Sequence, residues 1–573
     1  MRIIFLTLTF GLMACISYAK PIKPEMARNE AGKVLTAIKK HKVVAKQFLT
    51  KEQLKANNDN KSNSLPTYYA FNAEDGKGFV IMHADDEFPE VVAYNTELSL
   101  NTDAEMPQSL KSFLEAYGQY VNDVRNGIAK APEKEKGDVT GDIVVAPLIT
   151  SKWDQGSPYN YYCPNNTYVG CVATALAQIM YYYKYPETGK GSISYNCGQG
   201  TLAVDFTESH YDWSSYKDTY SSMEWKKDSG KAIAKLCLDA GAACKMQYGS
   251  GGSSSTIFDA YNAFFTYFGY DAQALTAYLR ECVESSEQWE RIVKAELNSK
   301  RPVLYAGSST TGSGRDAGGH AFIIDGYDSN FYVHVNWGWS GNYDGYYDID
   351  ILDGANYQFS EGQQMIVGIK PDPQGTNSKR KQFPMIMESE FVRSSKQPVA
   401  VDAQFNMKVG AIFNISPYSM SYTISVALYD YKGNFISEIG ANNDAHVVKL
   451  QSNQGYSEYG MVECKLKSTP TAGAYLLSVV SKEAGFDQFE LPYTTGGRKN
   501  NAIPVYIHDG YINFYEYPTA IDDIDIDANA NVIATDYFNA AGMKLNDWAN
   551  YHGTLIKRQT LSNGKTKTTK IMK

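Results

Sequence analysis

The segment from 165 to 186, NNTYVGCVATALAQIMYYYKYP, changes character at Cys171. Turn-forming residues precede the cysteine, and an apolar stripe with helical spacing follows it and ends at Pro186. The pattern predicts a helix whose first turn carries the thiol. Unpaired backbone N–H groups and the helix dipole favour negative charge there, which is how a protein lowers the pKa of a cysteine. Cys171 is therefore a candidate nucleophile, with half of a disulfide and a small core residue as the alternatives.

The N-terminus has the pattern of an export signal. A positive start at Arg2, an apolar run over 3–14 and the small-x-small sequence ending at Ala19 predict a signal peptide over 1–19. The apolar run is too short to span a bilayer, and we expect no other transmembrane segment. We therefore expect a soluble mature chain that is secreted or attached to the outer surface. A net charge of −9 argues against nucleic acid as a partner.

The cysteine count is odd once Cys15 is removed with the signal peptide. An odd number of cysteines in an exported chain indicates at least one free thiol. Spacing leaves open which of the others pair. The seven remaining cysteines are Cys163, Cys171, Cys197, Cys237, Cys244, Cys282 and Cys464.

With 573 residues, the chain is long enough for several domains. Residues 20–142 are expected to form a prosegment and linker: an α+β unit of their own, with amphipathic helices at 25–40 and 106–127 around short strands. The stretch 130–141 is charged and turn-rich without apolar periodicity. It is the best candidate for a linker and a natural site of proteolysis.

Residues 143–371 combine helices with later strands, which predicts an α+β domain. The expected helices are at 171–184, 229–245, 256–267 and 285–300, the last with a Ser cap. A linker at 370–382 follows.

The C-terminal third is expected to be all β. Alternating runs with frequent turn signals predict a β-sandwich of the Ig-like kind over 383–515. A last module over 520–573 contains a hairpin signal at Asn563-Gly564.

A thiolate nucleophile needs a base, and the middle region holds His210, His320 and His334. His210 lies in a polar stretch and is expected at the surface. His320 follows Gly318-Gly319, and small neighbours are what a substrate-facing base requires. An isolated GGH would indicate only a tight turn, so the assignment depends on the other residues of the set.

Asn336 follows His320 by sixteen residues, after a reversal at 327–330. We expect it to face the imidazole across a hairpin and to fix its tautomer, with Trp337 shielding that bond from water. His334 is given a supporting or core role. Gln155, upstream of the nucleophile, is expected to join the Cys171 backbone N–H in an oxyanion hole, where removing one donor typically lowers the rate ~10²–10³-fold.

Four motifs together resemble the streptopain family of papain-like cysteine peptidases over about 145–371: WDQGSPYN, GCVATALAQIMYYYKYP, GGHAFIIDGYD and FYVHVNWGWSGNYDGYY. The resemblance implies a papain-like catalytic domain. It implies Cys171 as nucleophile, His320 as general base and acid, Gln155 in the oxyanion hole, and Asn336 with Trp337 supporting the histidine.

The resemblance also implies how substrate is held. The family's mobile Gly-rich loop corresponds to 307–319, and MQYGSGGSSS at 246–255 looks like its substrate-binding wall. Gly249, Ser250 and Gly319 are the substrate-binding candidates.

Two further resemblances concern the ends of the chain. Residues 20–127 look like the inhibitory prosegment of such enzymes, which implies intramolecular inhibition and cleavage within 128–144. The end of 520–573 resembles the sorting domains of type IX secretion substrates, which implies that machinery as a partner.

The function expected from these observations is a secreted cysteine endopeptidase made as a zymogen and acting on proteins or peptides. The alternatives are a cell-wall peptide amidase and a surface adhesin with an inactive peptidase-like domain. No CxxC or HExxH spacing indicates zinc, and GSGGSSS lacks the lysine of a phosphate-binding loop. We expect no metal and no cofactor.

Overall fold

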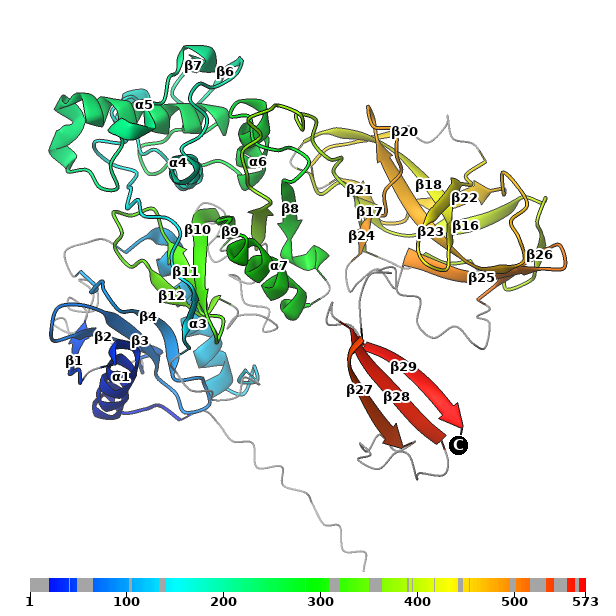
Figure 1. Cartoon of the computed structure of the whole chain (residues 1–573), viewed down its shortest axis with the longest axis horizontal. Helices are drawn as coiled ribbons and strands as arrows, with labels where there is room; N and C mark the ends of the chain where they lie inside the picture. The colour runs from blue at the N-terminus through cyan, green and yellow to red at the C-terminus, as the bar shows by residue number, and fades with distance from the viewer. Residues whose placement is uncertain are drawn as a thin grey trace, which may run out of the picture. The chain divides into compact units, whose positions relative to one another are not determined.

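The structure is a computed structural model, and Figure 1 traces the chain through it. It describes residues 20–40, 42–48, 65–101, 106–132, 141–283, 285–308, 319–349, 363–388, 391–393, 395–416, 418–441, 447–452, 454–494, 501–515, 532–539, 554–561 and 566–572. The predicted signal peptide, most of the predicted linker and most of the Gly-rich loop lie outside these ranges. The chain divides into two compact units, 1–281 with 285–381 and 282–284 with 382–573. Each is described by itself.

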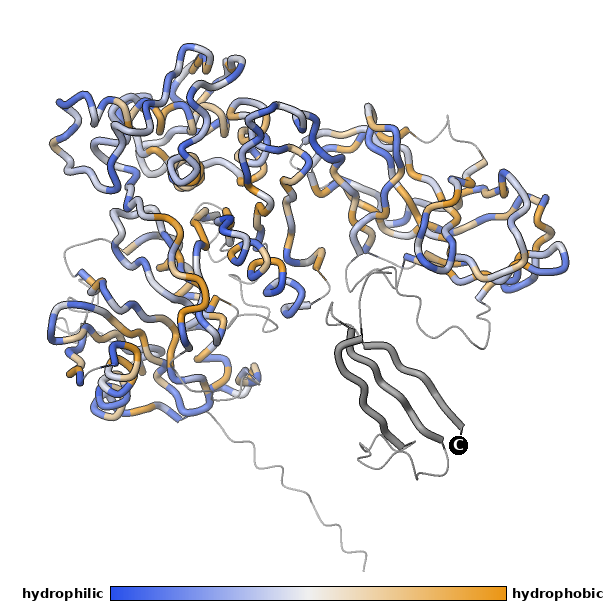
Figure 2. The backbone as a smooth tube through the Cα atoms, viewed as in Figure 1, coloured by the Kyte–Doolittle hydropathy of each residue, from blue (hydrophilic) through white to orange (hydrophobic). Residues whose placement is uncertain are grey.

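The first unit is built on one antiparallel sheet with eleven strands in the described residues. Ten of them follow the order β1 (Ala45–Phe48), β2 (Tyr68–Ala73), β3 (Phe79–His83), β4 (Val91–Asn95), β12 (Gly345–Tyr347), β11 (Val333–Asn336), β10 (Gly319–Asp328), β9 (Val303–Ser308), β13 (Gln364–Val367) and β8 (Thr276–Leu279). β5 (Ile143–Val145) pairs with the end of β10. Figure 2 shows the apolar residues concentrated along the central strands.

The prosegment packs two helices on this sheet. α1 (Pro24–Lys39) begins with a proline at its first position, and α3 (Gln108–Arg125) follows β4. The apolar stripe of α1 is buried at Ala27, Ala31, Val34 and Leu35.

The sheet continues from the prosegment into the catalytic region because β4 pairs with β12, Tyr94 opposite Tyr346 and Ala93 opposite Tyr347. Residues 20–127, predicted as a unit of their own, thus share one compact unit and one sheet with the catalytic region. Without the catalytic region, β4 would be the edge strand of the prosegment sheet. The antiparallel pairing with β12 satisfies the backbone groups along that edge.

The helices of the catalytic region lie at the predicted places, α4 (Cys171–Tyr183), α5 (Asp228–Ala243), α6 (Ile257–Thr266) and α7 (Ser286–Asn298). Ser285 caps α7 as predicted, since its hydroxyl accepts the Gln288 N–H. α4, α5 and α6 gather with the hairpin of β6 (Ser192–Asn196) and β7 (Thr201–Asp205) on one side of the unit, while the sheet forms the other (Figure 1). Short 3-10 helices cover Pro164–Asn166, Phe206–Glu208, Trp213–Ser215, Ser222–Lys226 and Arg280–Cys282.

The second unit consists of β-strands in its described residues, as the alternating pattern predicts. One seven-stranded sheet contains β15 (Val399–Ala400), β18 (Met420–Asp430), β19 (Phe435–Glu438), β20 (Val447–Leu450), β23 (Gly473–Glu483), β25 (Ala502–His508) and β26 (Tyr511–Phe514). Smaller sheets contain β14 (Ile386–Met387), β16 (Phe405–Val409), β17 (Ile412–Phe413), β21 (Gly455–Tyr456), β22 (Gly460–Cys464) and β24 (Tyr493–Thr494). The large and small sheets share one apolar core, for example Val426 and Val479 with Met407 and Ile412.

The C-terminal module is a three-stranded antiparallel sheet of β27 (Val532–Asn539), β28 (Thr554–Leu561) and β29 (Thr566–Met572). β28 and β29 pair around the predicted hairpin turn, whose own residues lie outside the described ranges. Among the described helices of the whole chain, none has the length and apolar character required to cross a bilayer.

Candidate active site

Cys171 is the first residue of α4, as predicted, and a glycine makes this position possible. Gly170 has φ +90°, which L side chains rarely adopt, and a Cβ there would lie 2.6 Å from Cε and Sδ of Met246. Its carbonyl accepts both the backbone N–H and the hydroxyl of Thr174, at 3.0 and 3.1 Å. The turn therefore brings the thiol onto the helix with no side chain directly before it.

The strand that carries His320 lies directly against this thiol. His320 is the second residue of β10, opposite Gly307 of β9. The backbone N–H of the next residue, Ala321, donates to Cys171 Sγ at 3.4 Å. The fold thus brings the two principal candidates of the sequence together from separate halves of the catalytic region.

The pKa shifts of Cys171 and His320 both favour the neutral form of the side chain. Burial raises the pKa of the Cys171 thiol above its usual range, and the N–H groups of Ala321 and Val172 offset this only in part. Burial also lowers the pKa of His320 to about 4. The sequence predicted a lowered thiol pKa from the helix terminus, whereas in this state desolvation outweighs the backbone N–H groups that lower the pKa. No hydrogen bond joins the Cys171 and His320 side chains in the described part of the chain.

Gln155 lies beside the chain that leads into α4. Its carbonyl accepts the N–H of Val169 at 3.0 Å, two residues before the nucleophile, and its own N–H donates to Asp154 Oδ1 at 2.6 Å. The residue is partly buried. These contacts hold the backbone of Gln155 beside the segment that leads to Cys171.

Asn336 is buried but does not lie opposite His320. In β11 it pairs with Ile323 of β10. Its Oδ1 accepts the Gly338 N–H and Gln178 Nε2, each at 3.0 Å, and its Nδ2 donates to the Ser151 carbonyl at 2.9 Å. The expectation that Asn336 faces the imidazole is therefore not met in this state, because the strand register and these three partners engage its amide elsewhere.

Sequence reasoning missed Gln178, which is fully buried on α4. Besides Asn336, it binds Ser151 Oγ at 2.9 Å and the Trp153 N–H at 3.3 Å, both through Oε1. The sequence does contain a sign of this residue, because Gln178 is the single amide in the apolar stretch VATALAQIM. It follows Cys171 by seven residues, which places both on the same face of the helix.

Trp337 is 2% exposed and packs against Phe322 and Tyr347, with ring centroids 4.9 and 5.2 Å away. Its indole N–H donates to the Tyr343 carbonyl at 3.1 Å. Its ring thus helps to build the core under β10 and β11.

The predicted substrate-binding wall lies beside the nucleophile. Ser253 Oγ donates to the Tyr168 carbonyl at 2.6 Å, which ties the wall to the segment before Cys171. In this wall Gly249 is partly buried and Ser250 is exposed. Gly319, the third candidate, begins β10 opposite Ser308.

Three buried ionisable side chains lie on or near β10 and β11: His334, Asp325 and Asp344. His334 Nδ1 lies 2.6 Å from Asp325 Oδ1. Burial opposes the charge on His334, but the Asp325 carboxylate attracts it, and the pKa of His334 is raised overall. Burial raises the pKa of Asp344 to about 7, although its Oδ1 accepts the Trp337 N–H at 2.9 Å. These residues support the turn after Asn336.

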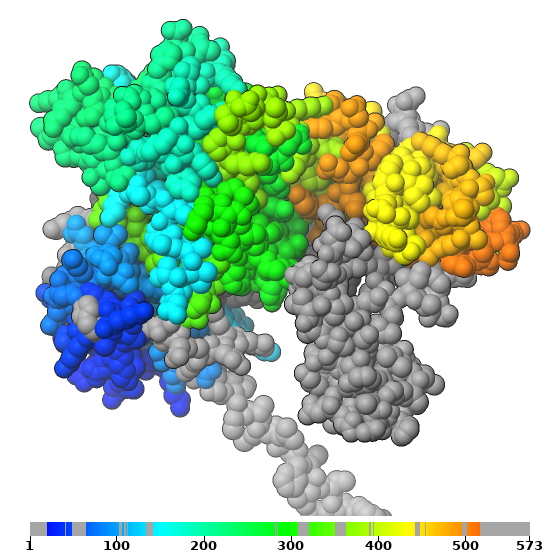
Figure 3. All heavy atoms as spheres, viewed as in Figure 1, coloured from blue at the N-terminus to red at the C-terminus, as the bar shows by residue number. Residues whose placement is uncertain are grey.

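The prosegment contacts the catalytic region along the seam between β4 and β12. Tyr94 stacks on Tyr346 at 5.1 Å with 13° between the rings, and its hydroxyl donates to Asp328 Oδ2 at 2.7 Å. Tyr332 OH donates to the Val91 carbonyl at 2.9 Å. Figure 3 shows the prosegment packed against the catalytic region on this face.

Within the described residues, the thiols of Cys163, Cys171, Cys197, Cys237, Cys244 and Cys464 are free, so Cys163 and Cys197 on either side of Cys171 do not pair. No set of His, Cys, Asp and Glu suited to a metal ion is found within the described ranges. His210 is exposed, as predicted.

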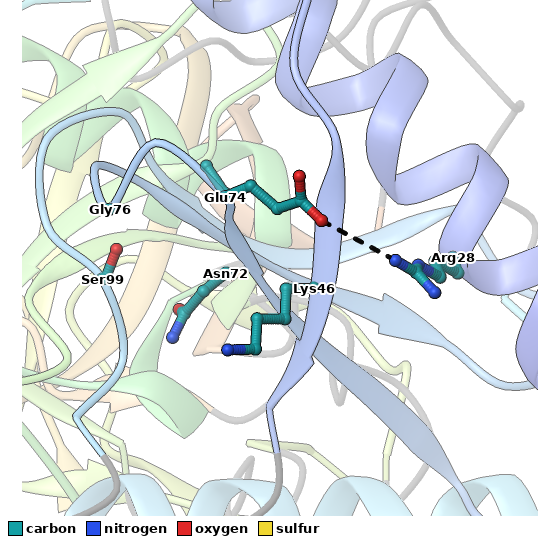
Figure 4. Close-up of a pocket in the computed structure, with 7 residues that line it drawn as sticks. Arg28, Lys46, Asn72, Glu74, Gly76 and Ser99 are labelled. Atoms are coloured by element: carbon teal, nitrogen blue, oxygen red, sulfur yellow. Dashed lines mark ion pairs between the residues drawn. The ribbon is translucent and has the colours of Figure 1, made fainter.

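A hollow of about 600 Å³ in the prosegment is lined by Arg28, Lys46, Asn72, Ala73, Glu74, Gly76 and Ser99 (Figure 4). The Arg28–Glu74 ion pair at its rim spans 3.9 Å with both side chains more than half exposed, so it contributes little stability. The catalytic candidates are not among these lining residues.

Comparison with known proteins agrees with this arrangement. Residues 153–347 match the model of the Peptidase C10 family, and residues 19–121 match that of the Spi protease inhibitor. Streptopain from Streptococcus pyogenes is 30% identical over 389 residues, which cover 60% of this chain and 92% of that protein. The thiol protease/hemagglutinin PrtT from Porphyromonas gingivalis is 29% identical over 53% of this chain and 37% of its own length.

Among solved structures, a fragment of prointerpain A from Prevotella intermedia is 31% identical, with a TM-score of 0.47, over 58% of this chain and all of that fragment.

The fold and the site therefore define a cysteine-type peptidase preceded by an inhibitor-like prosegment. More particularly, the chain belongs to the Peptidase C10 family.

Proposed function

We propose that this chain is a secreted cysteine endopeptidase made as a zymogen, with Cys171 as nucleophile and His320 as general base and acid. The Cys171 thiolate attacks the scissile carbonyl, and the oxyanion is held by the Cys171 N–H and Gln155. His320 protonates the leaving amine, and the acyl-enzyme forms. His320 then takes a proton from water, the resulting hydroxide displaces the thiolate, and the free acid leaves.

One observation carries this proposal. The Ala321 N–H donates to Cys171 Sγ at 3.4 Å, which means that the residue next to His320 already contacts the nucleophile at the start of α4. Apo geometry is often looser than catalytic geometry, so the absence of a direct bond in this state does not argue against the pair.

The same two residues also account for the inactivity of the uncleaved chain. A raised thiol pKa and an imidazole pKa of about 4 both oppose the thiolate–imidazolium pair that the reaction needs. The prosegment contributes a neighbouring strand and the Tyr94 hydroxyl to the catalytic sheet. Cleavage within 128–144, followed by loss of the prosegment, is the proposed activation step, and the side chains of Ile143 and Val144 at the end of that range are exposed.

The leader at 1–19 supports export, and Gly249, Ser250 and Gly319 are the proposed substrate contacts. The resemblance of 520–573 to sorting domains supports type IX machinery as the export partner. Deletion of 520–573 tests the last point, since export of the shortened chain at an unchanged rate contradicts it.

The test of the main proposal is active-site labelling. Full-length protein and linker-clipped protein are treated with an epoxide inhibitor of papain-like enzymes, and the adduct is located by mass mapping, with Cys171→Ala as control. We expect labelling of Cys171 and casein cleavage in the clipped protein and not in the full-length chain. An unreactive Cys171 in clipped, folded protein contradicts the proposal.

A further inference from the structure

Gln178 lies on the face of α4 that begins at the nucleophile. Two helical turns separate it from Cys171, with Thr174 between them, so the three residues form one stripe. The side chain is fully buried. A buried amide is costly unless both of its ends are hydrogen-bonded, which raises the question of what its partners are.

One end of the amide binds the segment that leads to Gln155. Oε1 of Gln178 accepts the Ser151 hydroxyl at 2.9 Å and the Trp153 backbone N–H at 3.3 Å. Trp153 precedes Gln155 by two residues. The helix that carries the nucleophile is therefore bonded directly to the segment that carries the oxyanion candidate.

The other end binds Asn336, which lies on the strand next to that of His320. Nε2 of Gln178 donates to Asn336 Oδ1 at 3.0 Å. The turn after Asn336 is also packed closely on the helix, because a Cβ at Gly338 would lie 3.1 Å from Thr174 Cγ2.

Backbone groups determine the orientation of both amides. The Trp153 N–H can only donate, which identifies the Gln178 oxygen and leaves its NH₂ facing Asn336. The Gly338 N–H identifies Asn336 Oδ1 in the same way, and the Ser151 carbonyl identifies its NH₂. A flip of either amide would place like groups together, so the network has one arrangement.

We propose that Gln178 is a positioning residue of this peptidase, whose single amide holds the Gln155 segment and Asn336 in fixed places relative to the Cys171 helix. The inference rests on the proposed function. It adds a residue that touches neither substrate nor reacting atoms and acts through groups that do. Catalytic groups must be held to within about 1 Å, since larger displacements lower rates about 100-fold.

The first variant is Gln178→Met, which keeps the volume and removes every hydrogen bond of the amide. Ile179→Val is the matched control, because Ile179 is a fully buried apolar neighbour on α4. Both are expressed as the full chain, clipped in the linker, and normalised by titration with the epoxide inhibitor. We expect kcat to fall at least about tenfold in Gln178→Met with KM within about twofold, and Ile179→Val to stay within about twofold of wild type.

The second variant, Gln178→Glu, keeps the shape and serves where the methionine variant does not fold. Its carboxyl accepts from Ser151 and Trp153 as before. Towards Asn336 Oδ1 it donates only when protonated, and an ionised carboxylate repels that oxygen. We expect the ratio of kcat/KM between Gln178→Glu and wild type to approach one at acidic pH and to fall at least about tenfold as the pH rises.

The outcomes separate the two proposals. A loss of kcat in the methionine variant, or a pH-dependent ratio in the glutamate variant, supports the positioning role, because a purely structural contact does not give a ratio that recovers on protonation. The inference alone is overturned if the wild-type enzyme is active, both variants keep the wild-type kcat, and the kcat/KM ratio of Gln178→Glu to wild type does not change with pH. Clipped wild type that neither cleaves casein nor labels at Cys171 overturns the proposed function instead.

Discussion

The backbone N–H of Ala321 donates a hydrogen bond to Cys171 Sγ, so the proposed nucleophile is contacted by the residue that follows the proposed general base, His320. A neutral thiol accepts such a bond weakly, whereas a thiolate accepts it strongly. The same contact therefore serves the latent state and, after ionisation, the active state.

The first prediction concerns the reactivity of the nucleophile. In the full-length chain, burial raises the pKa of the Cys171 thiol, so its alkylation by iodoacetamide should be slow at pH 7 and increase only well above pH 8. In the clipped enzyme, alkylation should already be fast near pH 6. Mass mapping of the alkylated site at each pH measures this, and identical pH profiles for the two forms contradict it.

The second prediction concerns His320 and acid stability. Because burial holds the pKa of His320 at about 4 in the folded chain, against about 6.5 unfolded, the unfolded chain binds more protons between these values. Stability therefore falls as the pH drops from about 6.5 to 4. In a Cys171→Ala background, His320→Asn should reduce that loss by up to about 3 kcal/mol.

Tryptophan fluorescence during urea unfolding at pH 7 and pH 4.5 is a suitable readout, because six of the seven tryptophans lie between 153 and 339. If the free energy of unfolding falls by the same amount at pH 4.5 with and without His320, the prediction is contradicted and the side chain of His320 is solvated in the folded zymogen.

The third prediction concerns the seam between prosegment and catalytic region. Tyr94→Phe removes the hydrogen bond to the Asp328 carboxylate, which is worth about 1.5–3 kcal/mol when charged and buried. We expect the full-length variant to show faster linker cleavage and a basal activity about tenfold above wild type. Tyr69→Phe is the control, since Tyr69 bonds the Ile22 carbonyl within the prosegment. Equal effects from both changes would argue against the seam as the point of inhibition.

The fourth prediction concerns Gly170. Ala at this position combines a disfavoured backbone conformation with a Cβ 2.6 Å from the Met246 side chain. We expect Gly170→Ala to lower the free energy of unfolding by about 1–3 kcal/mol and to lose most of its activity after clipping. Gly251→Ala in the neighbouring wall is the control, because its Cβ meets nothing within 4 Å. The result is measured by thermal unfolding and casein cleavage.

Much of the local structure could be predicted from the residues themselves. The helices after Cys171 and Ser285 follow from apolar spacing and a cap, and the all-β C-terminal region follows from alternation. Local signals such as these act over one or two helical turns or a single hairpin, and a linear pattern carries them completely. The family resemblance implied that Cys171 and His320 act together, and in the fold the residue after His320 contacts Cys171 Sγ.

The remaining features depend on contacts between distant segments. Periodicity does not specify which strand completes the edge of the prosegment, and only the fold pairs β4 with β12. The register of β11 decides that Asn336 lies opposite Ile323, and a shift of one residue would reverse its face. Burial, which no sequence window measures, decides that the Cys171 pKa rises despite the helix terminus.

The sequence by itself therefore determined the candidate nucleophile, its base, the order of the domains and the family. The tertiary structure decided the burial of the Cys171 and His320 side chains, the partners of Asn336 and the partners of Gln178. The physical reason is range: helix and strand formation depend on neighbours in the chain, whereas desolvation, strand register and buried amide pairing depend on residues that only folding brings together.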